Sequence, residues 1–138
     1  MNIKEQVLTI EQVRELQELG FDVEKHASMC WIKYKSDIEP YEETYHLTTL
    51  DESCYEASCL SPIPTLTVGD IMDILPKEIN DYYRLRAIQT TNQDSNIYYC
   101  AYVCSSLGTC KISFEDKTLI IPLFETLKWC IKEKHIAL

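Results

Sequence analysis

The chain has no long apolar run, and this absence excludes one class of protein at the outset. None of its hydrophobic stretches approaches the ~20 consecutive apolar residues that a transmembrane helix needs. The first residues, MNIKEQVLTIEQ, also lack the apolar segment of a secretory signal peptide. We therefore expect a cytoplasmic protein that does not associate with a membrane.

Glycine and basic residues are also scarce. The only glycines are Gly20, Gly69 and Gly108, from which neither GxGxxG nor GxxxxGK[ST] can be assembled, so no phosphate-binding loop is predicted. Lys and Arg number 13 against 22 Asp and Glu, which gives a net charge of -9. Binding to the phosphates of nucleic acids requires clustered basic residues. The composition therefore disfavours nucleic acid as a partner.

Tight metal-binding pairs are absent although the chain has seven cysteines and three histidines. The cysteine spacings are Cys54-x4-Cys59 and Cys100-x3-Cys104-x5-Cys110, with no CxxC or HxxxH pair. Structural zinc sites usually depend on such pairs. An odd number of cysteines in a reducing compartment indicates free thiols rather than a disulfide framework. We therefore expect no metal and no cofactor.

No catalytic signature is visible in the sequence. Nucleophilic catalysis needs a base beside a thiol or hydroxyl, and His26, His46 and His135 lie in no recognisable motif. Cys30 and Cys130 lie in strongly apolar segments, where buried thiols are unreactive. The sequence therefore favours a non-enzymatic protein, with no catalytic residue to name.

What the sequence does contain is a strong apolar stripe near its C-terminus. Apolar residues, among them Leu123 and Leu127, recur at helical spacing along Leu119–Ile136. This helix is predicted to carry much of the core. The sequence allows two starting points for this helix. Either Thr118 caps the helix and Pro122 bends its first turn, or the regular helix begins at Pro122.

A first helix is predicted over Ile10–Leu19 from its capping residues. Thr9 and Gln12 have the spacing of a capping box, in which each side chain bonds the other residue's backbone N–H. Gly20 follows the last apolar position and is suited to a left-handed C-terminal turn.

A second helix is predicted to begin with the same kind of capping pair. Thr67 and Asp70 have the same spacing as the first pair, ahead of a short apolar face. Pro76 is expected to end the regular helix at Leu75, with a short turn continuing to Ile79.

Segments rich in β-branched and aromatic residues predict the strands. They are Ser28–Tyr34, Thr44–Leu50, Tyr82–Gln89, Asn96–Cys104 and a shorter candidate, Cys110–Phe114. Asp51–Pro64 has no clear period and contains two prolines, so it is predicted to be a loop. The order of elements predicts one globular domain, 1–138, of the α+β class. We expect two layers, with a mostly antiparallel sheet of roughly three to five strands packed against about three helices.

The hairpin of Tyr82–Gln89 and Asn96–Cys104, with its tip at Thr90–Ser95, gives the one candidate functional surface. A turn centred near Asn92 would place Tyr82 opposite Tyr102, Arg84 opposite Cys100 and Arg86 opposite Tyr98 on one face. Tyr and Arg are enriched at binding hot spots, although they are also ordinary residues of a solvated sheet face. The hypothesis is that this face docks a protein partner or a second copy of the chain. Its residues are Tyr82, Arg84, Arg86, Tyr98 and Tyr102.

Four segments, in the same order, resemble a family of small uncharacterised proteins that are common in gut bacteria and in their prophages and mobile elements. They are LTIEQVRELQELG (8–20), SMCWIKY (28–34), IPTLTVGDIMDILPKEI (63–79) and ISFEDKTLIIPLFETLKWCI (112–131). The chain departs from this family at Pro122 and in the loop around Cys54 and Cys59. The resemblance implies a shared fold and no chemistry, and so favours a non-enzymatic accessory or interaction protein. The alternative is a small-molecule-binding protein or a small enzyme whose site is not visible in the sequence.

Overall fold

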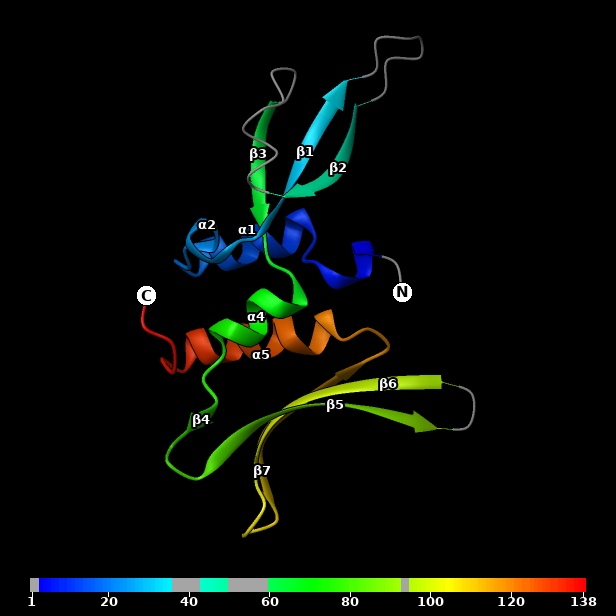
Figure 1. Cartoon of the computed structure of the whole chain (residues 1–138). Coiled ribbons are helices and arrows are strands. Elements are labelled where there is room, and N and C mark those ends of the chain that lie inside the picture. Colours follow the sequence, from blue (N-terminus) through cyan, green and yellow to red (C-terminus); the bar gives the residue numbers. More distant parts are fainter. Residues whose placement is uncertain (1–2, 36–42, 50–59, 93–94) are drawn as a thin grey trace.

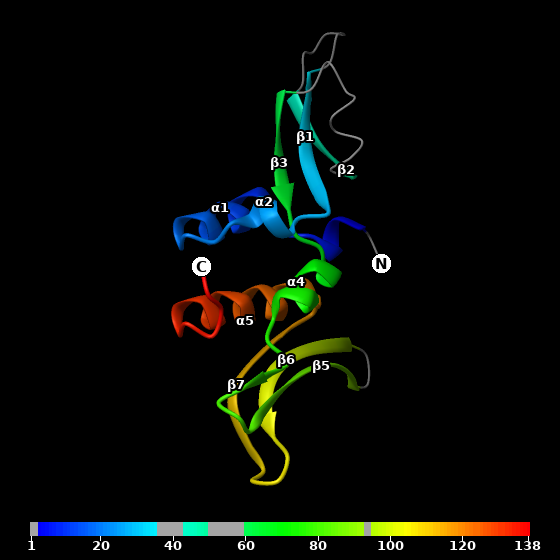
Figure 2. The same ribbon diagram turned by 60° about the vertical axis from the view of Figure 1, so that its left-hand side comes forward.

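The computed structural model describes residues 3–35, 43–49, 60–92 and 95–138. Within these ranges the chain forms four α-helices and two antiparallel sheets, one of three strands and one of four. Figures 1 and 2 show the helices lying between the sheets, with one sheet at each end of the molecule. The predicted α+β class is confirmed, and the strands are divided between two sheets.

Two of the helices begin where local capping chemistry predicts. Thr9 Oγ1 accepts a hydrogen bond from the N–H of Gln12 at 3.2 Å, and Thr67 Oγ1 accepts one from the N–H of Asp70 at 3.1 Å. Both reciprocal bonds are also formed, so both predicted capping boxes are confirmed. The helical elements are the 3-10 helix η1 (Ile3–Gln6), α1 (Ile10–Glu18), α2 (Val23–His26), α4 (Val68–Ile74) and α5 (Ile120–Lys132).

The strands pair only with antiparallel neighbours. The three-stranded sheet has the order β2-β1-β3, and the four-stranded sheet has the order β4-β5-β6-β7. The bounds are β1 (Met29–Lys35), β2 (Glu43–Thr49), β3 (Leu60–Thr65), β4 (Glu78–Ile79), β5 (Tyr83–Asn92), β6 (Ser95–Cys104) and β7 (Thr109–Asp116). The four strands predicted at Ser28–Tyr34, Thr44–Leu50, Tyr82–Gln89 and Asn96–Cys104 are therefore confirmed, and the shorter candidate is part of β7.

Part of the predicted loop Asp51–Pro64 is a strand. Leu60–Thr65 forms β3 and pairs with β1, so the prediction is wrong for this segment. Pro62 and Pro64 are tolerated because β3 lies at the edge of its sheet, where a missing N–H need not interrupt the ladder. The rest of the predicted loop, including both of its cysteines, lies outside the described residues.

The segment after α4 also differs from the prediction. The helix ends at Ile74, close to the expected position, but the predicted turn up to Ile79 contains the short strand β4. Asn80 and Asp81 then adopt left-handed backbone angles, with φ of 51° and 66°. These two residues reverse the chain into β5, which pairs with β4.

The organising C-terminal helix, α5, begins at Ile120, between its two predicted starts. Thr118 does not cap it, because its hydroxyl donates to Asp116 instead, at 3.3 Å. Pro122 lies in the first turn, where a backbone N–H has no partner within the helix in any case. In Figure 1, α5 lies beside α4 and above β5, β6 and β7.

One hydrophobic cluster joins the helices to the four-stranded sheet. Leu16 of α1, Ile71 of α4 and Leu127 of α5 are completely buried in it, together with Tyr102 of β6. Burying a side chain of this size contributes about 1.5–3 kcal/mol. The predicted apolar stripe is therefore the centre of the core, and α5 packs against α4, β6 and β7.

The register of β5 and β6 differs from the prediction by three residues. Leu85 pairs with Tyr102 rather than with Tyr99. Because side chains alternate between the faces of a sheet, an odd shift exchanges the two faces of one strand relative to the other. Tyr102 therefore lies on the helix-facing side, whereas Arg84 and Arg86 lie on the opposite side.

We call that opposite side the outer face. It is the side of the four-stranded sheet that carries residues alternating with the core residues Leu85, Cys100, Tyr102 and Ile112. Figures 1 and 2 show no described helix covering it. Its residues are Glu78, Arg84, Arg86, Ile88, Thr90, Ile97, Tyr99, Ala101, Val103, Ser113 and Glu115.

Candidate functional site

A polar pocket of about 280 Å³ opens on the outer face where β4, β5 and β6 lie side by side. Glu78 pairs with Arg84, and Arg84 pairs with Val103, so these residues stand in one row across the three strands. Arg86 lies two residues further along β5 on the same face. The remaining lining residues are Asp81, Tyr82, Cys104, Ser105 and Ser106.

Two tight turns supply the rim of this pocket. Asn80 and Asp81 form the left-handed reversal between β4 and β5, a conformation that Asn and Asp adopt more readily than most residues. This reversal leaves the Tyr82 side chain 70% exposed at the start of β5. On the other side, Gly108, with a φ of 62°, completes the turn between β6 and β7 that carries Ser105.

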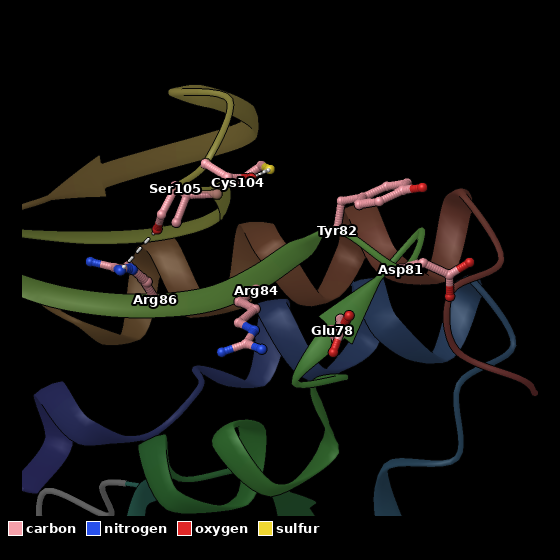
Figure 3. Close-up of a pocket in the computed structure, with 9 residues that line it drawn as sticks. Glu78, Asp81, Tyr82, Arg84, Arg86, Cys104 and Ser105 are labelled. Atoms are coloured by element: carbon pink, nitrogen blue, oxygen red, sulfur yellow. Dashed lines mark hydrogen bonds between the residues drawn. The ribbon is translucent and has the colours of Figure 1, made fainter.

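The two arginines of the pocket differ in their hydrogen bonding. The Nη2 atom of Arg86 donates to Ser105 Oγ at 3.2 Å, which fixes the direction of that guanidinium. The Arg84 guanidinium forms no hydrogen bond or ion pair with any residue in the described ranges. Figure 3 shows Arg86 and Ser105 at one end of the pocket, Glu78 and Asp81 toward the other end, and Arg84 between them.

Cys104 is the one thiol in the lining. Its Sγ atom lies 3.4 Å from Ser106 Oγ. The hydrogen bond with Ser106, and then one from the backbone N–H of Leu107, lower the pKa of this thiol below its ordinary value. The side chain is only 4% exposed, so it forms part of the wall of the pocket and not of its open centre.

The five residues predicted as a docking face do not share one surface. Tyr82, Arg84 and Arg86 all line the outer-face pocket. Tyr98 lies on the helix-facing side of β6 and lines a different cavity, near η1. Tyr102 is buried in the core, where its hydroxyl donates to the carbonyl of Pro76 at 2.8 Å. The predicted register is wrong, and with it the predicted grouping of these five side chains.

The sequence reasoning also missed the acidic and hydroxyl side chains of the pocket. Glu78 was assigned to a turn, and Asp81 and Ser105 were assigned to no site. The sequence did contain a signal for both rims, since Asn80–Asp81 and the run up to Gly108 are typical turn residues. A search for polar residues beside such turns would have included Glu78 and Ser105, although the sequence does not show that they meet Arg84.

The described part of the chain holds no group of three or more His, Cys, Asp or Glu side chains placed to bind a metal ion. Five cysteines in this part are free thiols: Cys30, Cys100, Cys104 and Cys130 are buried, and Cys110 is exposed. Across the same ranges, no helix combines the length and the apolarity needed to cross a membrane.

Neither a protein-family model nor a curated protein nor a solved structure matches this chain. The resemblance to small proteins of gut bacteria and their mobile elements therefore stays a prediction. Fold alone does not determine function, so the function must be argued from the geometry of the site.

Proposed function

We propose that this protein is a non-enzymatic binding protein that recognises a carboxylate group of its ligand through Arg84 and Arg86. The observation that carries the proposal is the presence of both arginines in one pocket of a chain whose net charge is -9. The planar guanidinium group matches the geometry of a carboxylate and can donate two parallel hydrogen bonds to it.

The spacing of the two arginines suits a single small anionic group. Residues two apart on a strand share a face and lie about 6.6 Å apart along it. Ser105 already orients the guanidinium of Arg86, whereas Arg84 keeps its donors available for a ligand.

The surroundings favour a carboxylate over a phosphate. Glu78 and Asp81 line the same pocket, and their charges oppose a ligand that carries more than one negative charge. The volume of about 280 Å³ lies near the lower limit for small-molecule sites, roughly 300 Å³. The ligand group that enters the pocket is therefore small and carries a single negative charge.

Titration followed by NMR tests this function. N-acetylglycine supplies a carboxylate, and N-acetylglycinamide is its neutral counterpart; both are added at constant ionic strength, because exposed charges are screened by salt. We expect the carboxylate, and not the amide, to shift the backbone resonances of Arg84, Arg86 and Ser105. Arg84→Gln should weaken this binding about tenfold, a loss of roughly 1.4 kcal/mol.

Arg14→Gln is the matched control. Arg14 is the third arginine of the chain and lies exposed on α1, outside the pocket. Equal binding of the carboxylate and the amide, or equal losses in the Arg14 and Arg84 variants, would show that the pocket does not recognise carboxylates.

A second candidate function is self-association through the outer face. Ile88 is 44% exposed there and pairs with Tyr99, which in turn pairs with Glu115. The arginines lie on β5 and Glu115 lies on β7, so a two-fold axis along the strands would bring Arg86 of one copy near Glu115 of the other. Sedimentation equilibrium tests this candidate. A mass that stays at 16.1 kDa over a wide range of concentrations would exclude it.

A further inference from the structure

We infer that the ligand of this pocket is a zwitterion of the free α-amino acid class. Its carboxylate would lie at Arg84 and its ammonium group at Glu78, with Arg86 and Asp81 flanking these two contacts. This inference rests on the proposed function and deepens it by adding a second point of recognition.

Opposite charges lie together in the pocket without forming an ion pair. Glu78 and Arg84 are partners in the register of β4 and β5. Nevertheless, no ion pair joins either residue to another described residue. The pocket therefore offers a cationic group and an anionic group at the same time.

An acidic and a basic side chain stand next to each other in the pocket. Figure 3 shows Glu78 beside Arg84, with Asp81 beyond Glu78 and Arg86 beyond Arg84. The ammonium and carboxylate of an α-amino acid are attached to the same carbon atom, so the two groups can contact two neighbouring side chains such as these. A ligand with a carboxylate alone would leave Glu78 without a partner of opposite charge.

The exposed ring of Tyr82 strengthens the cationic preference of the acidic end. It follows Asp81 directly, lines the pocket and is 70% exposed. Aromatic faces attract ammonium groups through the negative charge of the ring face. The lining residue next to Tyr82 in the chain is therefore an acid, and no basic side chain follows it before Arg84.

The decisive experiment compares three ligands on the wild-type chain. They are L-alanine, N-acetyl-L-alanine, which lacks the ammonium charge, and L-alaninamide, which lacks the carboxylate. Each is titrated at constant ionic strength and followed by the resonances of Glu78, Arg84 and Ser105. We expect L-alanine to bind at least about tenfold more tightly than either derivative.

Variants assign the two ends of the pocket. Asp81→Asn and Glu78→Gln remove charge with little change in shape, and Asn tolerates the left-handed backbone at position 81. Both variants should weaken the binding of L-alanine about tenfold and should not weaken the binding of N-acetyl-L-alanine. Arg84→Gln should weaken the binding of both ligands. Glu115→Gln, an acid on the same face but outside the pocket, should change neither.

The outcomes separate this inference from the proposed function. If N-acetyl-L-alanine binds as tightly as L-alanine and Arg84→Gln weakens both, carboxylate recognition stands and the zwitterion is excluded. If none of the three ligands binds and no variant changes the titration, both the zwitterion inference and the proposed function are overturned. The comparison of ligands needs only the wild-type chain, so it decides the question even where Glu78→Gln fails to fold.

Discussion

Two hydrogen bonds form a small polar network inside the core, and each depends on a single side chain. Cys130 donates from Sγ to the hydroxyl of Tyr102 at 3.5 Å, and that hydroxyl donates to the carbonyl of Pro76 at 2.8 Å. Burial raises the pKa of Tyr102 far above its ordinary value and raises that of Cys130 to about 11. Both groups therefore keep their protons at neutral pH.

The first prediction is that alkaline pH destabilises the fold through Cys130. Its folded pKa of about 11 lies above its ordinary value of 9.0, so the unfolded state releases its proton at lower pH. The stability that this protonated thiol contributes is complete below pH 9.0 and is lost as the pH rises toward 11. The linkage relation gives a loss of about 2 kcal/mol by pH 11.

Urea denaturation at a series of pH values measures this loss. Cys130→Ala should show a smaller decrease in unfolding free energy between about pH 9 and 11 than the wild type. Cys110→Ala removes an exposed thiol and should keep the wild-type slope. If all three proteins lose stability equally, Cys130 is not the cause.

The second prediction concerns the hydroxyl of Tyr102. Tyr102→Phe leaves the Pro76 carbonyl without this partner inside a half-buried site. Loss of one partner from such a pair usually costs about 1–3 kcal/mol of unfolding free energy. Tyr99→Phe is the control, because Tyr99 lies on the outer face. A loss in Tyr102→Phe no larger than in Tyr99→Phe would contradict the role of this bond.

At the scale of elements, α1 and α5 end in the same way but with different residues. In α5 the N–H of His135 bonds the carbonyl of Cys130 at 2.8 Å, and Lys134 has a φ of 62°. In α1 the equivalent left-handed position is Gly20, with a φ of 87°. Both are Schellman motifs, for which glycine is the preferred residue.

The third prediction is therefore that Lys134→Gly raises the unfolding free energy, by about 0.5–1 kcal/mol, because glycine adopts positive φ without steric cost. Gly20→Ala should have the opposite effect. A Cβ at Gly20 would meet Leu138 at an ordinary 3.5 Å, so that loss would come from the backbone conformation. Thermal denaturation of both variants measures the two effects. A Lys134→Gly protein no more stable than the wild type would refute the argument.

The elements that could be predicted from the sequence are those set by neighbours in the chain. The capping boxes of α1 and α4 need only residues three apart, so Thr9 with Gln12 and Thr67 with Asp70 were sufficient. β3 was missed because its prolines are tolerated only at a sheet edge. That edge position is a property of the assembled sheet and cannot be read from the strand itself.

The hairpin register was not predictable for a related reason. The pairing continues as far as Asn92 and Ser95, so the connection is shorter than the predicted tip, Thr90–Ser95. The segment has no Asn-Gly or Asp-Gly pair to fix a turn. The packing of Tyr102 beneath α5 distinguishes the correct register from its neighbours, and this contact joins elements far apart in the chain.

At the scale of the whole molecule, the candidate site combines residues that a local sequence pattern reveals with residues that only the assembled sheet brings together. Arg84 and Arg86 could be selected by residue type and by their spacing on one strand. Glu78 and Ser105 join them only because β4 and the β6–β7 turn are brought to β5 by the sheet. The two arginines could therefore be picked out together from the sequence, whereas their meeting with Glu78 and Ser105 could not be predicted from it.

The N-terminal segment holds the two ends of the molecule together. The carbonyl of Leu8 accepts hydrogen bonds from Trp31 Nε1 at 2.9 Å and from the Thr65 hydroxyl at 2.8 Å. The N–H of Leu8 donates to the carbonyl of Leu66 at 3.0 Å, and its side chain lies in the core cluster. One residue thus connects the three-stranded sheet to the helices and to the core shared with the four-stranded sheet.

This connection leads to the last prediction, that both ends unfold in one cooperative transition. The chain has two tryptophans: Trp31 belongs to the three-stranded sheet, and Trp129 belongs to α5, next to Tyr102 of the four-stranded sheet. Trp31→Phe leaves a reporter for one end, and Trp129→Phe leaves a reporter for the other. Ile63 of β3 packs against the core cluster, and Trp31 and Thr65 donate to Leu8, so separate unfolding of the three-stranded sheet would break these contacts at a cost in free energy.

In each single-tryptophan protein, the fluorescence midpoint in urea should therefore coincide with the midpoint of the far-ultraviolet circular dichroism signal. The comparison is made within each variant, so a change in overall stability caused by the substitution does not affect it. Trp31 is buried and donates to Leu8, which makes its emission sensitive to separation of the sheet from the helices. A Trp31 transition that precedes loss of the helical signal would mean that the three-stranded sheet unfolds independently, and that the bonds to Leu8 do not couple it to the core.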